Sequence, residues 1–253
     1  MKSALRMFLL YAAALALLSS STATSERTRA FTRIPRLVLW AWEMPERLDF
    51  IDPARVGVAY LDQTVYLNHD GRVQSRSRRQ PMQVPPRTEV IAVVRVEMQS
   101  GAPATAETRA ALVSALMRSA RRDGVAALQI DFDATKSQQA FYADVLSDLR
   151  RDMPANMPLS VTALASWCAF DRWLAAAPID EAVPMLFRMG REQNLFRSPQ
   201  RKPLIREPLC ADSLGVSVDE PWPAGLSGKR VYVFNPRPWT ARSFALVLER
   251  VKQ

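Results

Sequence analysis

Histidine and cysteine are scarce in this sequence of 253 residues, which contains one histidine and two cysteines. The histidine, His69, stands in the turn-like segment Asn68-His69-Asp70-Gly71, where we expect a solvated side chain. The sequence therefore excludes a metal site built from several histidines and leaves no histidine for a Ser-His-Asp triad. It also lacks a Cys/His cluster for zinc. We expect no metal and no other cofactor.

Patterns for binding nucleotides and nucleic acids are missing as well. No glycine-rich phosphate fingerprint follows an expected strand, and the sequence has no helix-turn-helix, RNP or zinc-knuckle pattern. The formal net charge is nevertheless +9, with arginines clustered in residues 72–87 and 188–206. Such a surface would attract anionic glycans or lipid headgroups, although a solvated basic face is the simpler interpretation. We expect no nucleic-acid partner.

Residues 1–23 have the composition of an export signal. Lys2 and Arg6 give a positive start, residues 7–18 are apolar but short for a membrane span, and Ser21-Thr22-Ala23 is a small-residue cleavage site. No later segment approaches the length of a span. The sequence predicts an exported protein, periplasmic or extracellular, with no stable membrane span after cleavage. The alternative is that the segment stays as an anchor.

The two cysteines are Cys168 and Cys210. In an oxidising compartment such a pair favours a disulfide. The bridge would close a loop of about 41 intervening residues and contribute about 3–4 kcal/mol to stability on a chain-entropy argument. Two buried free thiols are the alternative.

After a polar lead-in at residues 24–35, apolar strands and amphipathic helices alternate, which predicts one domain over residues 36–253. This order is typical of a parallel α/β fold, and about eight strands in this length favour a (β/α)8 TIM-like barrel. The barrel should be degenerate, because the crossovers after strands 2 and 7 are irregular and strand 2 continues into a hairpin. We expect strands at residues 36–43, 56–61, 89–98, 128–135, 158–167, 181–189, 214–220 and 230–235, and helices at residues 105–122, 137–151, 170–177 and 240–252.

The central strand carries two carboxylates on one face. In Leu128-Gln129-Ile130-Asp131-Phe132-Asp133-Ala134-Thr135, side chains alternate between faces, so Asp131 and Asp133 share one with Cα atoms about 7 Å apart. Where water is scarce the two cannot both ionise cheaply, which suits acid–base chemistry on a sugar. We expect Asp131 to be deeper, held ionised by Arg95 or bonded to Thr162, and Asp133 to be the proton donor at the rim. Pairing of both with arginines in a polar core is the alternative.

In a barrel of this class, functional residues lie at the carboxyl ends of the strands. There the sequence offers further carboxylates, tryptophans and polar side chains, which together indicate a carbohydrate site. Each also has a packing explanation, and Arg95 would neutralise a neighbouring carboxylate. Besides Asp131 and Asp133, the candidates are Glu220, with Glu43 and Glu97 weaker, for catalysis, and Trp42, Arg95, Trp167, Arg188, Asn235 and Trp239 for substrate binding.

Four segments resemble an uncharacterised bacterial family of exported proteins, domain of unknown function 3142: Leu128–Asp133, Leu164–Cys168, Val183–Gly190 and Val233–Trp239. The central strand is also distantly similar to the catalytic strand of the chitinase-like barrel glycosidases, whose motif is Asp-x-x-Asp-x-Asp-x-Glu. That resemblance implies catalytic roles for Asp131 and Asp133. However, Leu128 replaces the first aspartate of the motif, and Thr135 replaces its proton-donating glutamate.

A second carboxylate would have to replace that missing acid. Glu43, Glu97 and Glu220 are the candidates, and Asp133 with Glu220 is the natural pair in barrels whose catalytic groups lie on strands 4 and 7. We therefore expect a glycoside-hydrolase-like protein that acts on or recognises an envelope or extracellular polysaccharide or oligosaccharide. The alternative is a non-catalytic glycan-binding or cell-envelope assembly protein. The sequence identifies no protein partner.

Overall fold

The computed structural model describes residues 27, 31–190, 193–196 and 203–251. The expected export signal at residues 1–23 and half of the polar lead-in lie outside the described residues. Among the residues described, no helix is long and apolar enough to cross a membrane.

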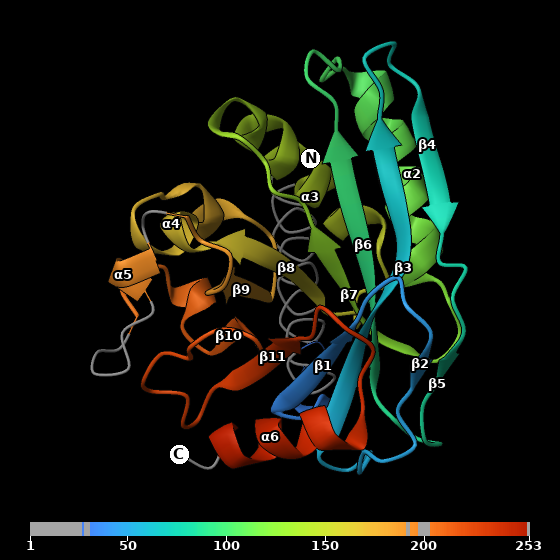
Figure 1. The fold of residues 1–253 in the computed structure, drawn as a ribbon. Coiled ribbons are helices and arrows are strands. Elements are labelled where there is room, and N and C mark those ends of the chain that lie inside the picture. Colours follow the sequence, from blue (N-terminus) through green and yellow to red (C-terminus); the bar gives the residue numbers. More distant parts are fainter. Residues whose placement is uncertain (1–26, 28–30, 191–192, 197–202, 252–253) are drawn as a thin grey trace, which may run out of the picture.

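Eight parallel strands close into a barrel, which confirms the predicted TIM-like fold (Figure 1). Around the ring the strands follow one another as β1-β3-β6-β7-β8-β9-β10-β11, and β1 pairs with both β3 and β11 to close it. The strands are β1 (Leu37–Ala41), β3 (Val56–Leu67), β6 (Val90–Met98), β7 (Val125–Asp131), β8 (Leu159–Leu164), β9 (Glu181–Met185), β10 (Ser213–Ser217) and β11 (Arg230–Phe234).

Helices cover parts of the outside of the barrel. The first long one begins where predicted, because the side chain of Thr105 accepts a hydrogen bond from the backbone N–H of Thr108 and so caps it. The α-helices are α2 (Ala106–Ala120), α3 (Gln139–Asp152), α4 (Ala165–Ala169), α5 (Gln193–Phe196) and α6 (Ala241–Val251), with short 3₁₀ helices η1 (Lys136–Gln138), η2 (Trp173–Ala176) and η3 (Pro208–Cys210).

The two irregular crossovers are present. After β3 the chain turns into β4 (Val73–Ser77), which pairs antiparallel with β3, and residues 218–229 between β10 and β11 contain no helix. A small sheet of β2 (Glu46–Arg47) and β5 (Met82–Gln83) was not predicted, because two-residue strands have no periodicity. In Figure 1, β3, β4 and β6 rise above the other strands as a wall beside the barrel mouth, with α2 behind them.

Two predictions, one about the fifth strand and one about the helix after it, were wrong. The strand β8 ends at Leu164, and Ser166 and Trp167 belong to the short helix α4. The helix expected at residues 170–177 is the single 3₁₀ turn η2. The reason is packing: in α4 the ring of Trp167 lies 5.0 Å from that of Trp173, within the outer core rather than at the strand end.

Large and polar side chains fill the barrel interior below its mouth. The indole N–H of Trp40 donates to the amide oxygen of Gln129 at 2.8 Å, and Gln129 donates to Ser160 at 3.1 Å. The carboxylate of Glu181 accepts from both Ser160 and Tyr232, each at 2.8 Å. These bonds satisfy the side chains named here and give the site above them a rigid floor.

Candidate functional site

Asp131 and Asp133 lie where β7 ends at the mouth of the barrel. Asp131 is the last residue of β7 and is only 8% exposed. The hydroxyl of Thr162, on the neighbouring strand β8, donates to its Oδ1 at 2.7 Å, and Nη1 of Arg95, on β6, lies 4.0 Å from its Oδ2. Asp133 is exposed at the mouth. The predicted difference in depth between the two carboxylates is therefore present.

Burial raises the pKa of Asp131 to about 6, and the charge of Asp133 beside it adds to this increase. The hydrogen bond from Thr162 and the charge of Arg95 lower the pKa of Asp131 but do not offset the burial. The walls of the two cavities partly desolvate the exposed Asp133 and so raise its pKa, against the lowering effect of Arg95. From the sequence we expected an ionised Asp131 and a proton-donating Asp133, whereas the structure favours the proton on the deeper group. Two coupled carboxyls titrate as a unit, so the proton belongs to the pair.

Arg95 and Glu97 form the next layer of charge at the mouth. Nε of Arg95 donates to Glu97 Oε1 at 2.9 Å, with the side chains 40% and 45% exposed. Both residues point to the same side of β6 as the barrel interior, because the alternate residues Val94 and Val96 pack in the outer core. Arg95 is thus hydrogen-bonded to Glu97, and its charge also offsets the negative charge of Asp131 and Asp133.

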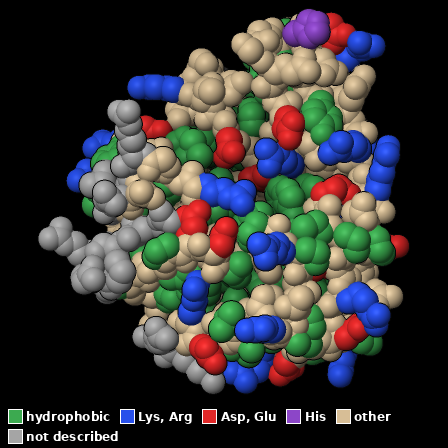
Figure 2. Space-filling view, in the orientation of Figure 1, with side chains coloured by type: hydrophobic (Ala, Val, Ile, Leu, Met, Phe, Trp, Pro, Cys, Tyr) green, Lys and Arg blue, Asp and Glu red, His purple; other side chains and the backbone are tan. Residues whose placement is uncertain are grey.

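Two cavities meet at the carboxylates. One, of about 380 Å³, is largely apolar, with walls formed by Trp42, Phe187 and Phe234. The other, of about 580 Å³, is lined by polar side chains that include those of Glu97, Ser100, Thr135, Ser137 and Gln138. Arg95, Asp131 and Asp133 line both cavities. In Figure 2 basic and acidic side chains are interspersed with hydrophobic ones on the face of the molecule that is shown, and no single sign of charge dominates it.

Four of the other predicted residues line these cavities: Trp42, Arg95, Glu97 and Arg188. The guanidinium of Arg188 lies over the ring of Phe234, with its central carbon 5.0 Å from the ring centre. The aromatic wall is a packed unit, because Phe187 stacks on Phe234 at 5.5 Å between centroids. Sequence analysis missed these two phenylalanines, although their positions at the ends of β9 and β11 are the signal that would have identified them.

The remaining predicted carboxylates lie elsewhere. Glu43 accepts a hydrogen bond from the backbone N–H of Arg79 at 3.0 Å, and Glu220 accepts one from the backbone N–H of Arg188 at 3.1 Å. Neither lines the two cavities. The structure therefore does not bring Glu220 to the cavity as a partner for Asp133, and Glu97 is the third carboxylate there.

Three predicted substrate-binding residues have structural contacts instead. Trp167 and Trp239 are 3% and 4% exposed, and the indole N–H of Trp239 donates to the backbone oxygen of Trp40 at 2.9 Å. The side chain of Asn235 is buried and accepts a hydrogen bond from the backbone N–H of Arg237 at 3.1 Å. Because these groups are buried and bonded within the protein, they stabilise the loops around the mouth. Within the described part of the chain, no group of three or more His, Cys, Asp or Glu side chains is arranged to hold a metal ion.

The raised pKa of Asp131 predicts that Asp131→Asn stabilises the protein at neutral and alkaline pH. A carboxyl with a folded pKa of about 6, against an ordinary 3.8, destabilises the fold as pH rises from about 4 to 6 and beyond. Removing that charge should increase the free energy of unfolding by up to about 3 kcal/mol at pH 8, and by little at pH 4. If Asp131 were instead ionised and paired with Arg95, the same substitution would lower the free energy of unfolding.

Chemical denaturation at both pH values measures this difference. Asp123→Asn, at an exposed position before β7, is the matched control and should change stability at neither pH. A less stable Asp131→Asn at pH 8 would instead mean that Arg95 holds the carboxylate ionised.

Comparison with solved structures finds partial likenesses. The chitinase domain of the spore coat protein CotE from Clostridium difficile matches with a TM-score of 0.40 and 12% identity, over 60% of this chain and 50% of that one. The spore cortex-lytic enzyme SleL from Bacillus cereus matches with a TM-score of 0.37 and 13% identity, over 73% of this chain and 52% of that one. The chain thus spans about half the length of each.

A comparison with curated proteins finds no match. The part of the barrel from β6 into β9 is similar to a known protein family. This part carries Arg95, Glu97, Asp131, Asp133 and Thr162. Residues 86–184 match the family described as "Domain of unknown function (DUF3142)", which confirms the resemblance expected from the sequence.

Proposed function

We propose that the barrel mouth binds a polysaccharide chain and that Asp131 and Asp133 perform acid–base chemistry on a glycosidic bond held there. The observation that carries this proposal is the meeting of two cavities, one aromatic and one polar, at a pair of coupled carboxyls. A chain of sugars lying through both cavities would place a linkage between two rings beside Asp133.

The walls of the two cavities suit the two kinds of surface that a sugar presents. The aromatic wall of Trp42, Phe187 and Phe234 offers contact for the apolar face of a ring, and Trp42 meets Phe234 edge-on at 6.4 Å. In the other cavity, Ser100, Ser137 and Gln138 offer hydrogen bonds to hydroxyl groups. This division matches the general design of ligand sites, in which apolar walls give affinity and a few polar groups fix orientation.

The coupled carboxyls supply the proton. When a sugar covers the exposed Asp133 and removes its water, the pKa of Asp133 increases and the shared proton shifts to it from Asp131. Asp133 then protonates the oxygen of the leaving sugar as the glycosidic bond breaks. Asp131 and Glu97, now both carboxylates, stabilise the positive charge that develops on the other sugar ring. A water molecule then forms a bond from its oxygen to the anomeric carbon of that ring and gives a proton to the Asp133 carboxylate, which restores the protonated pair. Asp133 is the group that contacts the substrate, and Asp131 acts through it.

Recognition without cleavage is the second candidate, and one observation favours it. Thr135 lines the polar cavity where the chitinase-like motif has its acid, and Glu220 is bonded to the backbone of Arg188 instead of replacing it. In that case the same walls would bind the glycan, and the carboxylates would only accept hydrogen bonds from its hydroxyls.

We place this activity in the periplasm or outside the cell. Cys168 and Cys210 are joined by a disulfide, and structural disulfides persist in oxidising compartments. The composition of residues 1–23 points the same way. Detection of the protein and of its amino-terminal sequence in fractionated cells tests this assignment.

Trp42→Ala tests the binding site. The half-buried indole of Trp42 lines the aromatic cavity, so its loss should weaken binding of oligosaccharides by about tenfold, which corresponds to about 1.4 kcal/mol. Trp222→Ala is the matched control, because Trp222 lines neither cavity and packs under Arg250. Calorimetric titration of both variants with a panel of neutral and anionic oligosaccharides measures the effect. Equal losses of oligosaccharide affinity in Trp42→Ala and Trp222→Ala, or no binding of any oligosaccharide by the wild type, would reject the proposal.

A further inference from the structure

We propose that the ligand is an acidic polysaccharide and that Arg188 pairs with an anionic substituent on one of its sugars. This inference rests on the proposed glycan site and deepens it by naming the substrate class. It starts from the charge at the aromatic cavity, which the acid–base chemistry does not use.

Arg188 presents a cation to the cavity without a carboxylate partner. Within the part of the chain that the structure describes, its guanidinium forms no ion pair, and its contact is with the face of the Phe234 ring at 5.0 Å. Arg95, by comparison, has Glu97 at 2.9 Å and Asp131 at 4.0 Å. A guanidinium over an aromatic ring stays available for a bidentate bond to a carboxylate or a sulfate ester.

The backbone at Arg188 is in a conformation that favours glycine. Its φ is 54°, in the left-handed region where a side chain with a Cβ is disfavoured. The carboxylate of Glu220 fixes this turn by accepting from the Arg188 N–H at 3.1 Å. A long charged side chain at such a position indicates a role for the side chain itself, because glycine would form the turn more easily. Glu220 is then a positioning residue for Arg188.

Charge separation within the cavity gives a ligand one orientation. Asp131 ends β7 and Asp133 follows it, whereas Arg188 follows β9, on the other side of β8. An anionic substituent is repelled from the carboxylates and attracted to Arg188, so a sugar ring on the aromatic wall would bind with that substituent toward β9. The positive net charge of the chain would also speed the approach of an anionic polymer.

Binding of three matched probes tests this inference: a carboxylated oligogalacturonate, a sulfated oligosaccharide and a neutral chito-oligosaccharide. The wild type should bind one of the anionic probes about tenfold more tightly than the neutral one. Arg188→Gln should remove that preference, and Arg188→Lys should restore part of it. The anionic probe that binds more tightly identifies the anion. Arg237→Gln, which removes an exposed arginine of the same rim outside the aromatic cavity, is the matched control and should leave all affinities unchanged.

Arg188→Gly separates a binding role from a structural one. Because glycine suits the left-handed backbone, this variant should melt at or above the wild-type temperature and still lose the anionic preference. Equal affinity of the wild type for neutral and anionic probes would overturn the inference, and so would equal losses of anionic affinity in Arg188→Gln and Arg237→Gln. Either result leaves the proposed glycan site intact as long as binding still depends on Trp42. Absence of binding to any probe would overturn the proposed function as well.

Discussion

Asp133→Asn should lower the rate of glycan cleavage by about a hundredfold or more and leave glycan affinity within about threefold. Asp133 is the exposed member of the carboxyl pair and lines both cavities, so it is the group that a bound sugar reaches. An amide of the same shape keeps the hydrogen bonds to hydroxyl groups but has no proton to transfer to the leaving oxygen.

Detection of released reducing ends from the best-binding oligosaccharide measures this rate. Asp219→Asn is a matched control, because Asp219 follows β10 on the same rim and accepts a hydrogen bond from Ser217 outside both cavities. Its rate should equal that of the wild type. Wild-type cleavage should also fall as pH rises above about 6, because the pair then loses its proton.

The result separates the two candidate functions. A wild type that binds glycans through Trp42 but releases no product at any pH would establish recognition without cleavage. An Asp133→Asn variant that cleaves at the wild-type rate would show that the carboxyl pair is a polar feature of the barrel mouth.

The barrel was predictable because its strands carry strong periodic patterns. The apolar alternation of β3, β6 and β7 and the capped helix α2 set the order of the fold, and the polar run after β3 predicted the hairpin with β4. The strand β8 and the helix α4 follow each other with no charged residue, glycine or proline between them, so the sequence carries no signal for where the strand ends and the helix begins. Only packing of Trp167 against Trp173 decides where the strand ends.

The candidate site was predictable where its residues lie on strands. Arg95, Asp131 and Thr162 point into the barrel from three consecutive strands, and alternation alone gives that direction. Residues beyond the strand ends follow no such rule. Glu220 bonds to a backbone N–H, and Trp239 folds back to donate to the oxygen of Trp40. Loop conformation decides both contacts, and the sequence pattern carries no information about it.

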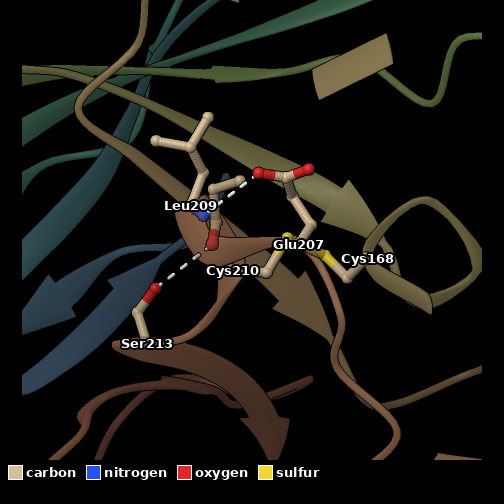
Figure 3. The surroundings of a disulfide bond; sticks show 6 residues. Cys168, Glu207, Leu209, Cys210 and Ser213 are labelled. Atoms are coloured by element: carbon tan, nitrogen blue, oxygen red, sulfur yellow. Dashed lines mark hydrogen bonds between the residues drawn. A yellow bond between two sulfur atoms is a disulfide. The ribbon is translucent and has the colours of Figure 1, made fainter. Parts of the chain in front are cut away.

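Removal of the disulfide should produce the largest loss of stability. It joins Cys168, in α4, to Cys210, in η3, across a sequence separation of 42 residues, and both side chains are fully buried (Figure 3). The backbone N–H groups of Arg206 and Glu207 also donate to the backbone oxygen of Cys168, at 2.8 and 3.0 Å. The bridge thus connects the segment after β8 to the segment before β10 and encloses the chain that contains β9.

A Cys168→Ala/Cys210→Ala variant should lose about 4 kcal/mol of unfolding free energy, because the crosslink no longer restricts the unfolded chain. The melting temperature should fall by about 10 °C in a protein of this size. Reduction of the wild type should give the same loss, but slowly under native conditions, since the buried sulfurs are reached only when the segment opens. The double variant is the control, and a reductant should not change its melting temperature. Equal stability of the oxidised and reduced wild type, with both thiols shown to be free, would mean that the bonds to the Cys168 oxygen and the buried packing hold α4 and η3 together without the bridge.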